Sequence, residues 1–122
     1  MFTLSSHHKF NLFSQPTDMR KGFNGLSGIV NNILKDNPRS GEVFIFINKR
    51  RNKIKLLQWQ GGGFVLYYKR LEQGAFELPE YEELAGSIVL SYTKMAMIVD
   101  GLSIKNIASR KRFNPVNTTV TA

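Results

Sequence analysis

The chain has 122 residues, of which 42% are hydrophobic and 21% charged, a composition typical of one globular domain. It contains no cysteine, which excludes a disulfide framework and thiolate catalysis and indicates a reducing compartment, the cytoplasm. The net charge is +8, which suits a polyanionic partner such as nucleic acid, although positive charge that only maintains solubility is the alternative.

The N-terminal segment is expected to hold a short strand within residues 2–13, with Phe10, Leu12 and Phe13 as its apolar part. It lacks the apolar core of a secretory signal. The most apolar later stretch, residues 87–104, contains Lys94 and Asp100, so no membrane partner is expected.

A helix is predicted for residues 18–34, capped by Thr17 or Asp18 after the turn SQPTD. Its apolar residues recur at helical spacing: Met19, Phe23, Leu26, Val30, Ile33 and Leu34. Three glycines inside this segment each cost about 1 kcal/mol relative to alanine. Either the helix packs very closely on another element, or its first half is not regular helix.

Three strands should follow, at residues 42–47, 54–60 and 64–71, because these runs are rich in β-branched and aromatic residues. The connections NKRRNK and GGG are short enough for hairpins. An acidic connection, residues 72–86, leads to a further strand at 87–91 and a short helix from Ser91 to Gly101.

The predicted fold is therefore α+β. It consists of an antiparallel meander of about four to five strands, the longer helix on one face and a short C-terminal helix. Residues 1–104 form a single domain, and residues 105–122 form a basic, flexible tail with a cluster at Arg110–Arg112.

No catalytic residue, metal site or cofactor is predicted. His7 and His8 are adjacent, so on a strand they would point to opposite faces. The GGG segment is followed by Phe64 and another strand, whereas a phosphate-binding loop requires Lys-Ser/Thr and a helix. A metal-dependent nuclease using Asp18, Asp100 and a loop glutamate remains an alternative, but the spacing does not bring these residues together.

The sequence INKRRNKIKLL places a dense run of positive charge at the tip of the first predicted hairpin. A basic two-stranded ribbon fits a nucleic-acid groove and provides phosphate contacts. The strand end at Lys69 and Arg70 should lie on the same side of the sheet, with aromatic side chains that can stack on bases. The candidate DNA-binding residues here are Lys49, Arg50, Arg51, Lys53, Lys55, Trp59, Tyr67, Lys69 and Arg70, with Tyr68 beside them. The alternative is an exposed turn whose lysines protect a sheet edge from aggregation.

Arg20 and Lys21 fall in the first turn of the predicted helix, where cations oppose the helix dipole. A helix N-terminus with two added cations favours the binding of an anion. Simple pairing of these cations with Asp18 or a loop glutamate is the alternative.

Three segments together resemble the small TnpB-type accessory protein of bacterial insertion sequences of the sixty-six family, which is distinct from the RNA-guided nuclease that shares the TnpB name. The segments, within residues 10–102, are SQPTDMRKGFNGLSGIV, GEVFIFINKRRNKIKLLQWQGGGFVLYYKRLEQGAFELP and SIVLSYTKMAMIVDGL. Departures from the family pattern at Gln60, Ala75 and Glu77 leave the basic clusters intact.

The resemblance implies a product of a mobile element that assists transposition and does not imply a known catalytic activity. The leading hypothesis is a non-enzymatic accessory factor that binds DNA, at the element ends or without specificity, through the basic hairpin tip. The rival hypothesis is a protein-interaction adaptor that docks on the transposase or another accessory protein, using exposed aromatic residues and the acidic loop.

Overall fold

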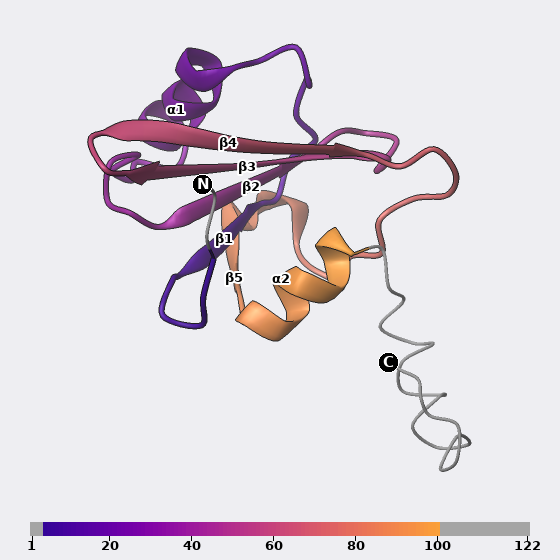
Figure 1. Ribbon diagram of the computed structural model, residues 1–122. Coiled ribbons are helices and arrows are strands. Elements are labelled where there is room, and N and C mark those ends of the chain that lie inside the picture. Colours follow the sequence, from indigo (N-terminus) through magenta and orange to yellow (C-terminus); the bar gives the residue numbers. More distant parts are fainter. Residues whose placement is uncertain (1–3, 101–122) are drawn as a thin grey trace.

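The computed structural model describes residues 4–100 and shows a five-stranded sheet with one helix on each face (Figure 1). The strands lie in the order β4-β3-β2-β1-β5. The α+β prediction is therefore confirmed. The elements in chain order are β1 (Phe10–Phe13), α1 (Phe23–Asn32), β2 (Val43–Ile47), β3 (Lys53–Gln60), β4 (Gly63–Arg70), the short 3₁₀ helix η1 (Glu83–Ala85), β5 (Ser87–Leu90) and α2 (Tyr92–Val99).

The strands β2, β3 and β4 form the predicted antiparallel meander, joined by two tight hairpins. At the first hairpin Ile47 pairs with Ile54, and at the open end of the second hairpin Lys53 pairs with Arg70. The end of β4 therefore lies beside the turn at residues 48–52, hereafter the hairpin tip. This part of the sequence prediction is confirmed.

The strand β1 departs from the predicted meander because it pairs with β2 in parallel, in the register Phe10 with Val43. Its other neighbour, β5, is antiparallel and pairs Phe10 with Leu90. A parallel pair requires a long connection, and the segment containing α1 supplies it. The sequence pattern identified these strands, but alternation of apolar residues does not reveal the direction of pairing.

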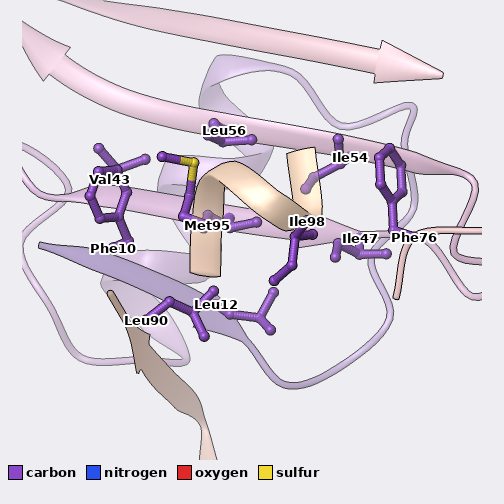
Figure 2. Close-up of a cluster of buried hydrophobic side chains, with 11 residues drawn as sticks. Phe10, Leu12, Val43, Ile47, Ile54, Leu56, Phe76, Leu90, Met95 and Ile98 are labelled. Atoms are coloured by element: carbon purple, nitrogen blue, oxygen red, sulfur yellow. The ribbon is translucent and has the colours of Figure 1, made fainter. Parts of the chain in front are cut away.

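Both faces of the sheet are covered, so its central strands are buried on each side. Along β2 the side chains alternate: Val43, Ile45 and Ile47 join the core beneath α2, whereas Phe44 and Phe46 join the core beneath α1. Figure 2 shows the first of these cores, with Met95 and Ile98 of α2 against the sheet. Burial on both faces explains the unbroken apolar run of β2.

The helix α1 begins at Phe23, later than the predicted residue 18. The Asp18 carboxylate accepts the backbone N–H of Arg20, and the Asp18 carbonyl accepts the N–H of Lys21. These bonds form a turn before the helix, and Gly22 is the N-cap. Hence residues 18–22, predicted as the first turn of the helix, form a loop. Arg20 and Lys21 lie in this loop, before the helix begins.

The C-terminal part of the prediction is also confirmed within the described residues. β5 and α2 lie where they were expected, and the Ser91 side chain caps α2 by accepting the N–H of Lys94. The expected helix end at Gly101 and the tail at 105–122 lie outside the described residues. Across residues 4–100, no helix has the length and apolar character needed to cross a membrane.

Candidate nucleic-acid interface

The hairpin tip is a compact turn held by two asparagines. The N–H of Arg51 donates to the Asn48 carbonyl at 3.0 Å, and the Asn48 side chain accepts the N–H groups of Asn52 and Lys53 at 3.0 Å each. Arg51 has a φ of +59°, a left-handed conformation that costs a non-glycine residue about 1 kcal/mol. The turn therefore presents Lys49, Arg50 and Arg51 to solvent from a fixed backbone.

A shallow groove of about 470 Å³ lies between the hairpin tip and the 18–22 loop, hereafter the cationic groove. Its charged and aromatic lining residues are Asp18, Arg20, Lys49, Arg50, Lys53 and Tyr68. The loop and the tip are distant in sequence, and the fold brings their positive charges to one surface. The grouping of Arg20 with Lys49, Arg50 and Lys53 is thus a property of the folded chain.

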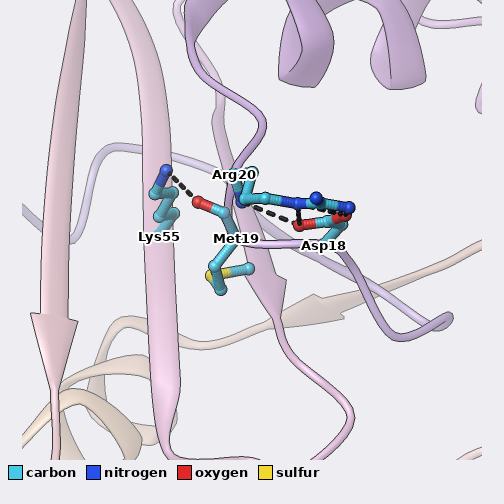
Figure 3. A network of polar contacts seen from close by, with 4 residues as sticks. All are labelled: Asp18, Met19, Arg20 and Lys55. Atoms are coloured by element: carbon cyan, nitrogen blue, oxygen red, sulfur yellow. Dashed lines mark hydrogen bonds and ion pairs between the residues drawn. The ribbon is translucent and has the colours of Figure 1, made fainter.

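Arg20 does not contribute its charge freely, because it is paired with Asp18 (Figure 3). The Arg20 Nε donates to both Asp18 carboxylate oxygens, at 3.1 and 3.0 Å, and an Nη donates to Oδ2 at 2.7 Å. These hydrogen bonds hold the Asp18 pKa well below its usual range and raise the pKa of Arg20. The pair is neutral, so the net positive charge of the groove comes from Lys49, Arg50 and Lys53.

The sequence predicted that Lys55 belongs to an exposed DNA-binding patch, but in the structure its side chain is buried. The residue is only 6% exposed, and its Nζ donates to the Met19 carbonyl at 2.7 Å (Figure 3). It also donates to the Lys21 carbonyl at 2.8 Å. The ammonium also lies 4.6 Å from the centre of the Tyr68 ring. With its donors directed at backbone oxygens, Lys55 fastens the 18–22 loop to the sheet rather than meeting a ligand.

The predicted patch is further divided by the pleat of β4. Arg70 pairs with Lys53 and Tyr68 with Lys55, so all four side chains share the face that carries α1. Lys69 and Tyr67 point to the other face. There Tyr67 packs against the core beneath α2, and the Lys69 Nζ donates to the Val99 carbonyl at 2.8 Å. Neither residue lies in the cationic groove.

Trp59 lies near the far end of β3, six residues and therefore about 20 Å from Lys53. The Arg39 guanidinium covers its ring at 4.9 Å, and Phe64 meets it edge-on at a centroid distance of 5.0 Å. The structure thus separates Trp59 from the hairpin tip with which the sequence interpretation grouped it.

The remaining candidate cations flank the groove. Lys21 is exposed, and its stem lies so close to Gly25 that a Cβ there would come within 3.0 Å of the Lys21 Cβ. Arg51 lines a neighbouring depression of about 170 Å³ together with Lys49 and Glu83. Arg70 is exposed and forms a 3.0 Å ion pair with Glu72. Lys21 and Arg51 therefore extend the positive surface beyond the groove, whereas the charge of Arg70 is balanced by Glu72.

Sequence reasoning left Asn48 and Asn52 unassigned, although they set the shape of the hairpin tip. Their spacing is a readable signal, because asparagine favours turns in which its side chain bonds nearby backbone groups. Tyr68 was noted beside the patch, and the structure places it in the groove while Tyr67 is turned away. The strand register, which distinguishes the two tyrosines, is a tertiary property.

Metal-dependent chemistry has no assembled site in the described part of the chain. Between residues 4 and 100, no group of three His, Asp or Glu side chains is gathered as a metal ion requires. Asp18, one member of the alternative nuclease set, is engaged with Arg20.

Fold and site define a small α+β protein with a rigid basic hairpin and a cationic groove beside it. The profile of the family described as IS66 Orf2 like protein matches residues 8–109 of the chain, and the chain belongs to this family of insertion-sequence accessory proteins. This confirms the resemblance found in the sequence. The family carries a transposition-associated accessory role and is not a known enzyme family.

Two curated proteins of Sinorhizobium fredii are similar to the chain. The uncharacterized protein y4jC is 35% identical over 89 residues, covering 73% of this chain and 74% of its own length. The uncharacterized protein y4hO is 35% identical over 86 residues, covering 70% and 73% respectively. No solved structure matches the chain significantly.

Proposed function

We propose that the protein assists transposition by binding DNA through the hairpin tip and the cationic groove, without catalysing a reaction itself. One observation supports this proposal above the others. The fold joins the exposed tip, Lys49 and Arg50, to Lys53 and the 18–22 loop around one groove, and the carboxylate that lines it, Asp18, is already neutralised by Arg20. Such a surface attracts a phosphate backbone.

The physical form of this binding is electrostatic. Contacts between side-chain cations and phosphates release counterions, so affinity falls as salt rises, with a slope that counts the contacts. Since these contacts carry no base information, the groove by itself binds any DNA of suitable shape. Recognition of element ends would need further contacts or the transposase of the same element as a partner.

Gel shifts and fluorescence anisotropy across a salt series test the proposal, using element-end DNA and random DNA. The double variant Lys49→Glu/Arg50→Glu should weaken binding by about tenfold or more at moderate salt and lower the salt slope by about two. Lys94→Glu is a matched control, because Lys94 is exposed and far from the hairpin tip. It lies in the first turn of α2, and α2 begins just after Leu90, at the end of β5 that is remote from the tip. Its effect should be smaller and non-specific.

Two outcomes would contradict DNA binding at this surface. The first is no retardation of either DNA by the wild-type protein at low salt and micromolar concentration. The second is equal weakening by Lys94→Glu and by a single Arg50→Glu substitution, which would show that only the net charge matters.

A second candidate function, an adaptor for the transposase or another accessory protein, is favoured by a different surface. At the β5 edge of the sheet Leu84 is 90% exposed and Val89 61% exposed, next to the exposed carboxylates of Glu82 and Glu83. Exposed apolar side chains beside negative charge fit a partner segment that brings apolar groups and positive charge.

Co-purification with the transposase after nuclease treatment separates the two functions. If the adaptor function holds, Leu84→Ser/Val89→Ser should abolish the complex while Lys49→Glu/Arg50→Glu preserves it. The opposite pattern, or loss of the complex with nuclease alone, would contradict a direct adaptor role.

A further inference from the structure

Among the residues that the structure describes, Tyr68 is the one aromatic side chain lining the cationic groove, and it is 50% exposed. The sheet register explains why. On the α1 face of the hairpin, Leu57 and Leu66 form a pair that packs beneath the helix, and the next pair towards the tip is Lys55 with Tyr68. Tyr68 therefore stands where the apolar cover ends, on the edge strand β4.

One side of the Tyr68 ring is already held by the protein. The Lys55 ammonium lies 4.6 Å from the ring centre and is itself fixed by the carbonyls of Met19 and Lys21. A cation at this distance attracts the ring and limits its movement. The residue as a whole remains 50% exposed, so an accessible aromatic surface is oriented before any ligand arrives.

The charges around the ring are arranged for a phosphate backbone. Tyr68 lines both the cationic groove and an adjoining depression of about 310 Å³ that contains Arg70 and Glu72. Lys53 and Arg70 form the next pair along the same face towards the tip. A strand crossing Tyr68 would thus meet Lys53 at the tip side of the ring, with Arg70 beside it in its ion pair with Glu72.

We propose that Tyr68 stacks on an unpaired DNA base, so that the groove takes single-stranded or frayed DNA in preference to intact duplex. This inference rests on the proposed DNA-binding function and specifies its substrate. In a duplex each internal base is already stacked on its neighbours, and only an unpaired or terminal base has a face to offer. Aromatic platforms flanked by cations are how proteins hold single strands without reading sequence.

Fluorescence anisotropy with a single-stranded oligothymidine, and its competition by a relaxed, covalently closed circular duplex at equal phosphate concentration, test the inference, because that duplex has neither ends nor unpaired bases. Tyr68→Leu should weaken binding of the single strand by about 5- to 150-fold, the range that stacking of one base supports, and change duplex binding by less than about twofold. Tyr68→Phe should preserve both affinities, because the ring and its contact with Lys55 remain.

A single strand carrying 2-aminopurine reports stacking directly. Its fluorescence should be quenched on binding wild type and Tyr68→Phe, and less so on binding Tyr68→Leu at saturation. Tyr92→Leu, at an exposed tyrosine on α2, is the matched control and should leave single-strand affinity unchanged. Thermal denaturation of each variant confirms that it is folded.

Three outcomes are distinguishable. If neither DNA binds at low salt, the proposed function fails and this inference with it. If both bind and Tyr68→Leu weakens them equally, or weakens neither, DNA binding stands and the stacking role is wrong. Selective loss of the single strand by Tyr68→Leu, with rescue by Tyr68→Phe, supports both.

Discussion

On each face of the sheet one lysine of the β3–β4 hairpin donates to backbone carbonyls, but the two lysines hold different parts of the fold in place. On the α1 face Lys55 donates to the carbonyls of Met19 and Lys21, and on the α2 face Lys69 donates to the carbonyl of Val99. The first lysine holds a loop beside an open groove. The second holds the C-terminal end of a helix over an apolar core.

This difference shows that positive residues clustered in the sequence do not all contribute to one surface of the folded protein. The four cations on β3 and β4 form two groups: Lys55 and Lys69 donate to backbone oxygens, whereas Lys53 and Arg70 lie beside Tyr68 at the two depressions. Of these, Lys53 is available to a polyanion on the face that carries the groove, and Arg70 beside it is paired with Glu72. The groove depends on Lys55 through the position of the 18–22 loop, whereas Lys69 donates to the Val99 carbonyl, outside that loop.

The largest expected effect is on Lys55. Lys55→Met keeps the stem but removes the ammonium, which leaves two carbonyls without their donor, and we expect unfolding free energy to fall by about 3 kcal/mol. Urea denaturation measures it. Lys53→Met, two residues away on the same face, is the control and should change stability by less than about 0.5 kcal/mol while weakening DNA binding. Equal destabilisation by the two substitutions would contradict the comparison.

A smaller effect is expected on the other face. Lys69→Met removes one hydrogen bond and one cation near the C-terminal end of α2, so the cost should be about 1 kcal/mol. Hydrogen exchange should quicken in the last turn of α2 and not in the 18–22 loop. DNA affinity should change by less than about twofold. A loss of DNA affinity as large as that of Lys53→Met would mean that Lys69 contacts the ligand.

The smallest stability effect is expected for Asp18→Asn. The amide oxygen still accepts the Arg20 N–H, but the ion pair is lost, and exposed ion pairs contribute little. Arg20 is then free to bind phosphate, so single-strand and duplex affinity should both rise, by about three- to tenfold, with a steeper salt slope. Unchanged affinity would show that Arg20 does not face the DNA.

The same variant has a defined pH signature. The Asp18 pKa is depressed in the folded protein, so the stabilisation by its charge is fully present above the carboxyl pKa of the unfolded chain, about 3.9, and is lost progressively as pH falls below it. Between pH 4 and 2 wild type should therefore lose slightly more stability than Asp18→Asn. Thermal melts at several pH values measure the difference.

Much of the fold was predictable because it depends on local patterns. The meander of β2, β3 and β4 follows from apolar runs separated by short turns, and Ser91 marks the start of α2. The parallel pairing of β1 with β2 was not predictable in this way, since the direction of a strand is set by the path of α1 between them. The late start of α1 follows from a turn around Asp18 that competes with the helix.

The sequence by itself determined the family, the hairpin with its basic tip and the identity of the charged residues. Only the tertiary structure decided which of those charges face solvent. Lys53 and Lys55 are two residues apart on one strand and share a face, so no periodicity distinguishes them. What separates them is the 18–22 loop, distant in sequence, which covers Lys55 and leaves Lys53 in the groove. A buried ammonium needs acceptors, and only folding brings the carbonyls of that loop to it.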